Sequence, residues 1–290
     1  MVEEKVCTFK ARDEADLQYY LYSEGNEKNK PTIIFIHGIT AELHHIRQFA
    51  SKAKKEANVI IPILRGYHPN LIRGDLQYKG QYDDDLEDLC LYLQSIDLQN
   101  VYWCGHSMGC GNLLRVLKKE TVSKLSEGFI FLSPFFHPTL PVYNFQNSSN
   151  KDLNDIYELK LLKSILLYTL HQFKVQIFSK TKVVKVPDDF HENKLLHLSF
   201  RLMISRIPDA RMLNTLYKSK IPLFMMIGDE DEVTNATKLA EWWKGRTNHP
   251  YKMQKGHNHN TIISEDSNVY EVLDWVKTIF DKQTKVTSEP

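Results

Sequence analysis

The segment Gly105-His106-Ser107-Met108-Gly109 lies between a short apolar run, residues 101–104, and a stretch of helical periodicity, residues 110–119. The first run is β-branched and aromatic and predicts a buried strand, whereas the second spaces its leucines for a helix. A strand that turns directly into a helix strains the turn residue, and glycines two positions to either side let the neighbouring backbones approach. Ser107 is therefore expected on a sharp turn, with its hydroxyl at a helix N-terminus that favours negative charge.

Composition limits the broad class of the protein. The chain has 290 residues, of which 42% are hydrophobic and 25% are charged, values typical of a globular protein with a sizeable core. Its length suits a single α/β domain that carries an insertion. The formal net charge of +1 gives no electrostatic reason to expect nucleic acid or an anionic membrane as a partner.

Cysteine and histidine usage indicates the compartment and argues against a metal centre. The four cysteines form neither a CxxC pair nor a disulfide-like framework, which favours a reducing intracellular compartment. The histidines are scattered and show no zinc-site spacing with cysteine. The first five residues do not resemble a signal peptide, and no apolar stretch is long enough to span a membrane. We expect a cytoplasmic protein that needs no metal or cofactor.

Apolar runs alternate with helical patterns along most of the chain. Runs at 32–36, 59–64, 127–133, 221–228 and 251–254 predict strands of a mostly parallel sheet, and residues 5–10 and 17–22 predict an antiparallel edge. Three consecutive Asp residues, 83–85, begin the helix that precedes the Ser107 strand. They are interpreted as charge at a helix N-terminus, because adjacent side chains point in different directions around a helix and suit no single cation.

In its order of motifs the chain resembles the α/β-hydrolase superfamily, in particular carboxylesterases and lysophospholipase or monoacylglycerol lipase-like enzymes. The Ser107 segment resembles the family's nucleophile elbow, and the stretch from Arg73-Gly74-Asp75 to Asp85 resembles bacterial lysophospholipase-like hydrolases. The resemblance covers the chain from Thr32 onward. It implies an α/β-hydrolase core formed by residues 1–134 and 219–290, with a mostly parallel sheet covered by helices on both faces. Residues 135–218 would form an inserted helical cap, in which no family motif is found.

The resemblance also implies an oxyanion hole. In the family, the backbone N–H just after the His-Gly pair that follows the first parallel strand supplies one donor, and this maps to Ile39, with Thr40 as the less favoured candidate. The second donor would be the N–H of Met108. His37-Gly38 could also be a plain strand-ending turn, but the presence of Ser107 favours the catalytic interpretation.

Two positions remain for the acid and the base of a triad. The family places the acid three residues after the strand-ending Gly228, which selects Asp231, with Asp229 as the fallback; a solvated acidic turn is the alternative. Some members place the base three residues after a glycine, which selects His259, and others directly after it, which selects His257. His259 is favoured because residues 260–265 resemble the family's following loop.

These residues predict a serine hydrolase that cleaves a carboxylic ester of a lipophilic acyl group through Ser107, His259 and Asp231. Amide, peptide or thioester hydrolysis is possible on the same triad. A haloperoxidase or a carbon–carbon hydrolase would use it too. A hydrolase fold that only binds a ligand is the alternative from another class.

The cap would mostly pack against the core, and part of it would line the substrate pocket. Its lysines Lys160, Lys163 and Lys174 also permit weak contact with a membrane surface. The oligomeric state is not indicated by the sequence.

Overall fold

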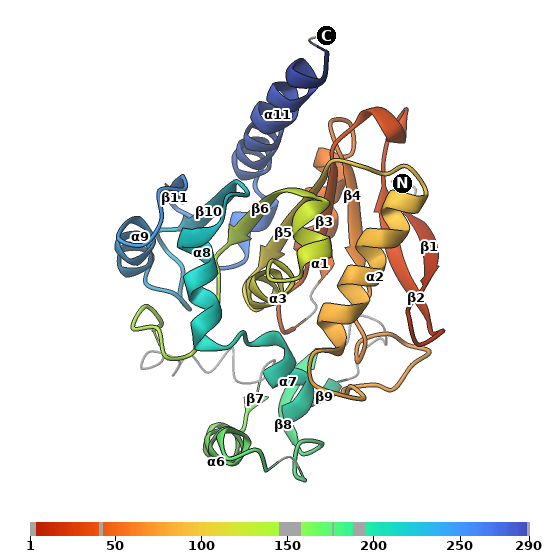
Figure 1. Cartoon of the computed structure of the whole chain (residues 1–290). Coiled ribbons are helices and arrows are strands. Elements are labelled where there is room, and N and C mark those ends of the chain that lie inside the picture. The colour runs from red at the N-terminus through yellow and green to blue at the C-terminus, as the bar shows by residue number, and fades with distance from the viewer. Residues whose placement is uncertain (1–3, 41–42, 145–157, 176, 188–194, 289–290) are drawn as a thin grey trace.

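The computed structural model describes residues 4–40, 43–144, 158–175, 177–187 and 195–288. Within these ranges, eight strands form one central sheet in the order β1-β2-β4-β3-β5-β6-β10-β11 (Figure 1). In chain order the strands are β1 (Lys5–Lys10), β2 (Asp16–Tyr22), β3 (Thr32–Ile36), β4 (Asn58–Pro62), β5 (Val101–His106), β6 (Ser126–Leu132), β10 (Leu223–Gly228) and β11 (Tyr251–Gln254).

The sheet is parallel except at one edge. β1 and β2 form an antiparallel pair, and β2 also runs antiparallel to β4. All other neighbours are parallel, so the predicted mostly parallel sheet with an antiparallel edge is confirmed. Strands β3, β4, β5 and β10 are buried along their whole length. A strand covered on both faces must be apolar on both, which explains their continuous apolar sequence.

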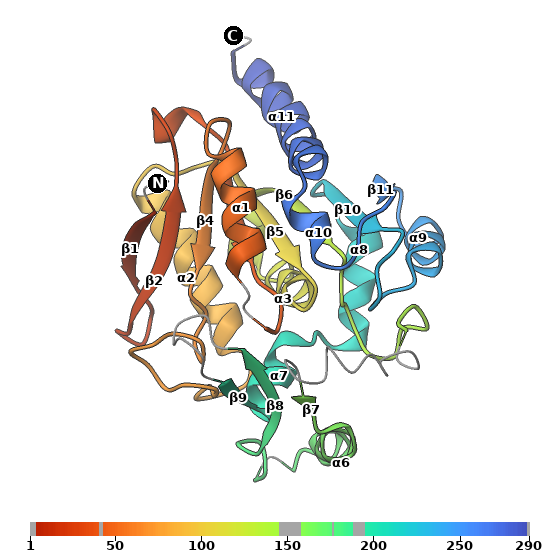
Figure 2. The same cartoon turned by 180° about the vertical axis from the view of Figure 1, so that it is seen from behind.

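Helices cover both faces of the sheet (Figures 1 and 2). Buried residues of one group of helices share a core with one face, namely α2 (Gln81–Ser95), α3 (Gly109–Val116), α4 (Glu120–Lys124) and α9 (Ala236–Lys244). A second core lies under α1 (Leu43–Ala53), α10 (Thr261–Ser264) and α11 (Asp266–Ser288). A short 3-10 helix, η1 (Glu27–Asn29), precedes β3. The sequence pattern predicts a last helix over residues 269–280, whereas α11 begins at Asp266 and continues to Ser288.

The insertion between β6 and β10 contains a second sheet in addition to helices. Strands β7, β8 and β9 form a three-stranded antiparallel sheet. The helical expectation for residues 135–218 did not include this sheet, although the three valines within residues 182–187 favour a strand. Its elements are β7 (Glu158–Leu159), α6 (Leu161–Gln172), β8 (Lys182–Pro187), β9 (Leu195–Ser199), α7 (Phe200–Arg206), η2 (Ala210–Leu213) and α8 (Asn214–Lys218). The polar composition of residues 144–154 predicts a loop, but apart from Asn144 these residues lie outside the described part of the chain.

The three aspartates at the start of α2 pair with three different cations. Asp83 accepts from Arg115 at 2.6 Å, and Asp84 accepts from Lys119 at 2.8 Å.

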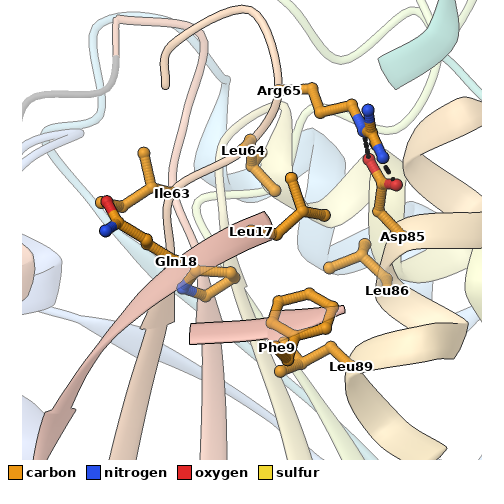
Figure 3. A pocket seen from close by; sticks show the side chains of 10 residues that line it. Phe9, Leu17, Gln18, Ile63, Leu64, Arg65, Asp85, Leu86 and Leu89 are labelled. Carbon is orange, nitrogen blue, oxygen red and sulfur yellow. Dashed lines mark hydrogen bonds and ion pairs between the residues drawn. The ribbon is translucent and has the colours of Figure 1, made fainter. Parts of the chain in front are cut away.

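The third aspartate, Asp85, accepts two hydrogen bonds from Arg65 Nε at 2.8 and 3.0 Å, beside a cavity of about 10 Å³ (Figure 3). Such a cavity has room for about one water molecule. It therefore belongs to the packing of α2 against the antiparallel edge and is too small for a substrate.

Replacing Arg65 by Met should lower the free energy of unfolding by about 3–5 kcal/mol, because Asp85, whose pKa burial already raises to about 7, is left buried without its charged partner. Urea denaturation measures the change. Lys28→Met is the matched control, since Lys28 and Asp97 form an exposed ion pair that contributes less than about 1 kcal/mol. Equal losses in the two variants would contradict the prediction.

Candidate active site

Ser107 occupies the strained turn that the sequence predicts between β5 and α3. Its φ of +52° lies in the left-handed region, which L side chains rarely adopt. Its N–H donates to the carbonyl of Leu132 at 3.1 Å, and its own carbonyl accepts from Phe135 at 3.1 Å and Cys110 at 3.0 Å. These bonds hold the turn from both the next strand and the following helix. The side chain is partly exposed and can be reached from outside.

Two glycines allow the backbone to close around this turn. A Cβ on Gly109 would lie 2.2 Å from the carbonyl oxygen of Ile36, so any larger residue there would push α3 away from β3. A Cβ on Gly38 would lie 3.3 Å from Cβ of Ser107. The loop after β3 therefore lies directly against the serine.

His259 and Asp231 form a close pair. The Nδ1 atom of His259 lies 2.9 and 3.1 Å from the two carboxylate oxygens of Asp231. Both side chains are buried, and Asp231 Oδ1 also accepts from the N–H groups of Val233 at 2.9 Å and Thr234 at 2.8 Å. These backbone donors fix the orientation of the carboxylate. The carboxylate in turn holds the imidazole with Nδ1 facing it, which leaves Nε2 for other chemistry.

His259 and Asp231 each shift the pKa of the other so that its charged form is favoured. Burial by itself lowers the pKa of His259, but attraction and hydrogen bonding to Asp231, with a smaller effect of Glu232, raise this pKa above its ordinary value. For Asp231, burial raises the pKa, but the charge and the hydrogen bond of His259 lower it below its ordinary value. The protonated imidazole is thus stabilised next to an ionised carboxylate.

The loop that carries His259 is attached to the strand that carries Ser107. Nε2 of His106 donates to the carbonyl of His259 at 2.8 Å, and the two rings lie 4.8 Å apart. Burial lowers the pKa of His106 to about 3, so this donor is a neutral imidazole at physiological pH. In the described part of the chain, no hydrogen bond joins Ser107 Oγ to His259 in this conformation. Such bonds are often long in enzymes without substrate and shorten in the complex.

The three side chains follow three different strands. Ser107 follows β5, Asp231 follows β10 and His259 follows β11. Because these strands are parallel, their carboxyl ends meet at one edge of the sheet, where open α/β sheets bind their ligands.

The fallback residues lie in the same loops but have other contacts. Asp229 is exposed, and its carboxylate accepts from the N–H of Gly256 at 2.6 Å. The carbonyl of His257 accepts from Glu230 at 3.1 Å. Among the described residues, neither side chain forms a hydrogen bond with Asp231 or His259.

The loop after β3 is held by a residue that the sequence analysis did not single out. Arg206, at the end of α7, is fully buried, and no carboxylate among the described residues pairs with it. Its guanidinium donates to the carbonyls of His37 and Gly38, the latter at 2.8 Å, and to Asn112 Oδ1 at 2.9 Å. The hydroxyl of Tyr67 donates to the next carbonyl, that of Ile39, at 2.6 Å.

These contacts fix the direction of one backbone donor. The carbonyl of Gly38 and the N–H of Ile39 belong to one planar trans peptide and point in opposite directions. Because Arg206 binds this carbonyl, the N–H of Ile39 is directed away from Arg206. The sequence offers only a weak signal for this role, an arginine that ends the apolar run 195–207.

The comparisons with known proteins agree with this architecture. The family model described as alpha/beta hydrolase fold matches residues 31–266. The chain belongs to the alpha/beta hydrolase fold family. This membership confirms the predicted fold class and the resemblance on which it was based.

Individual members of the alpha/beta hydrolase fold family are distant from this chain. A Mycoplasma genitalium protein provisionally named esterase/lipase 3 is 24% identical over 220 residues, which are 72% of each chain. A thermophilic esterase from Thermogutta terrifontis has a TM-score of 0.62 at 12% identity, covering 95% of this chain and 99% of the other. A soluble variant of monoglyceride lipase from Saccharomyces cerevisiae has a TM-score of 0.63 at 16% identity, covering 96% and 94%.

Two kinds of feature are absent from the described residues of this alpha/beta hydrolase. These residues contain no helix that is both long and apolar enough to cross a membrane. They also contain no group of three or more His, Cys, Asp or Glu side chains placed to hold a metal ion.

We expect His259 to titrate above the ordinary histidine pKa in the native protein and well below it in Asp231→Asn. The substitution removes the charge that raises the pKa but leaves the burial that lowers it. NMR titration of the histidine ring protons measures both values, with assignment by His259→Gln. An unchanged pKa in Asp231→Asn would contradict the electrostatic coupling of the pair.

Proposed function

We propose that this chain is a serine hydrolase that cleaves a carboxylic ester of a lipophilic acyl group. The observation that carries the proposal is the His259–Asp231 pair at the same sheet edge as Ser107, whose turn conformation presents its hydroxyl at the start of α3. The esterases and the lipase among the similar proteins favour an ester as substrate. Residues 135–218 act as the cap over this edge.

In the proposed mechanism, Nε2 of His259 accepts the proton of Ser107 Oγ as the oxygen attacks the acyl carbonyl. Asp231 stabilises the imidazolium that forms. The N–H groups of Ile39 and Met108 donate to the oxyanion of the tetrahedral intermediate. His259 then protonates the leaving alcohol, and water repeats the sequence on the acyl-enzyme.

Arg206 acts in this mechanism as a positioning residue. It does not reach the reacting atoms but fixes the peptide that carries the Ile39 donor, as the bond to the Gly38 carbonyl indicates. Its placement in the insertion joins the cap to the oxyanion loop.

The four cysteines, all in the described part of the chain, are free thiols. This state supports a reducing compartment, and we propose that the enzyme works in the cytoplasm.

Replacing Ser107 by Ala should leave the fold intact and lower kcat for ester hydrolysis on the order of 10⁶-fold, because the nucleophile is lost. Rates on p-nitrophenyl esters of increasing chain length measure activity and pocket size together. The exposed Ser95→Ala is the control and should retain full activity. Hydrolysis that survives in Ser107→Ala would remove Ser107 from the role of nucleophile.

The same substrates separate the alternatives. Faster turnover of matched amides or thioesters would reassign the substrate class while keeping the triad. A fluorophosphonate probe labels an activated serine, so a chain that stays unlabelled at neutral pH would be a binding protein instead.

For Arg206→Met we expect kcat to fall about 100-fold while KM changes less than about threefold, because misplacing a transition-state donor affects mainly the chemical step. Arg206→Lys should recover little, since one ammonium group cannot reach all four acceptors, which include the hydroxyl of Tyr67. Arg246→Met removes an exposed arginine and serves as the control. Circular dichroism shows whether each variant is folded. A change confined to KM would contradict the positioning role.

A further inference from the structure

Helix α6 and the turn after it expose an unusual number of large apolar side chains. Leu162 is 85% exposed, Phe173 76% and Ile177 80%. Ile165 and Leu166 lie one turn after Leu162 on the same face of the helix and are also more than half exposed. We call these five residues, together with the exposed Phe178, the α6 surface.

The opposite face of α6 packs against the rest of the insertion. Ser164 and Leu167 are buried, and α6 packs on β8 of the small sheet. A helix that is apolar on both faces is normally buried on both. Monomeric soluble proteins rarely leave a contiguous apolar patch of this kind in water. No described residue covers the α6 surface, so we look for an apolar partner outside the described part of the chain.

The lysines around α6 indicate what kind of partner the α6 surface binds. Between Glu158 and Asp188 the sequence contains six lysines and neither Asp nor Glu, in a chain whose formal net charge is only +1. Lys160, Lys163, Lys174 and Lys180 are exposed, and no carboxylate among the described residues pairs with them. Their stems can lie along an apolar surface while their ammonium groups reach phosphate.

We propose that the α6 surface docks on an anionic lipid bilayer, with its apolar side chains at the level of the acyl chains and the lysines on the headgroups. A second copy of the chain would cover the apolar residues but bring two sets of lysines together, which is unfavourable. Anionic lipid satisfies both features at once.

Docking on this surface orients the proposed active site. Figures 1 and 2 place α6 at the end of the molecule opposite the end of α11. The insertion that carries α6 also carries α7, whose Arg206 contacts the loop beside Ser107. The sheet edge with Ser107 therefore faces the bilayer side. Binding to a bilayer is a separate activity from the proposed ester hydrolysis, and it does not require the Ser107 hydroxyl.

Flotation with lipid vesicles tests the proposal, using the full chain as Ser107→Ala so that no lipid is cleaved. The protein should float with vesicles that contain phosphatidylglycerol and much less with pure phosphatidylcholine, and salt should release it. Leu162→Gln and Phe173→Gln should each weaken partitioning about tenfold. Lys163→Gln and Lys174→Gln should each weaken it about fivefold.

Matched variants on α11 serve as controls. Tyr270, which is 52% exposed, and the exposed Lys277 lie outside the α6 surface, so Tyr270→Gln and Lys277→Gln should not change partitioning. Made in the chain that keeps Ser107, none of the α6 substitutions should change hydrolysis of a soluble short-chain ester. Vesicle binding is thus measured separately from the proposed activity, and either can fail alone.

Three outcomes would overturn the proposal. The protein could fail to float with phosphatidylglycerol vesicles, or float equally with phosphatidylcholine. Sedimentation velocity without lipid could instead reveal a dimer that Leu162→Gln dissociates, which would assign the α6 surface to a second copy of the chain.

Discussion

A buried guanidinium that no carboxylate pairs with, among the residues the structure describes, holds the loop at the centre of the candidate site. Arg206 satisfies its hydrogen bonds with the carbonyls of His37 and Gly38 and with Asn112 of α3. A buried charge is tolerated only where several acceptors replace water. The same bonds that make the arginine tolerable also fix the loop after β3 against the turn of Ser107. In this way one residue joins the insertion, the loop after β3 and the helix after the serine.

The histidine part of the site contains a pair of opposite charges. In the proposed cycle the positive charge of His259 forms transiently, beside the carboxylate of Asp231, which stays ionised. Asp231 is kept ionised by backbone donors and by His259, although it is buried. The neutral His106, one residue before Ser107, holds the carbonyl of His259. The imidazole is thus fixed from both sides, and its protonation alone changes during the proposed cycle.

The sequence predicted the core well because its signals are local. The alternation of apolar runs, the glycines around Ser107 and the spacing after Gly228 and Gly256 each concern a single turn or strand end. The small sheet of the insertion was missed because β7 has only two residues, and the strand signal of β8 alone does not show which segments it pairs with. Arg206 was missed for a similar reason. Its partners lie 168 and 169 residues away in the chain, and no local pattern marks an arginine whose acceptors are carbonyls.

The position of Arg206 also limits how a substrate can enter. Moving α7 outward would separate a desolvated cation from its acceptors and release the loop that carries the proposed Ile39 donor, at a cost of several kcal/mol. We therefore expect α7, which ends at Arg206, to keep its position when a ligand enters. In the proposed hydrolase, an opening beside α6 and its turn would leave the contacts of Arg206 intact, so substrate entry and the support of the loop beside Ser107 would fall to different parts of one inserted segment.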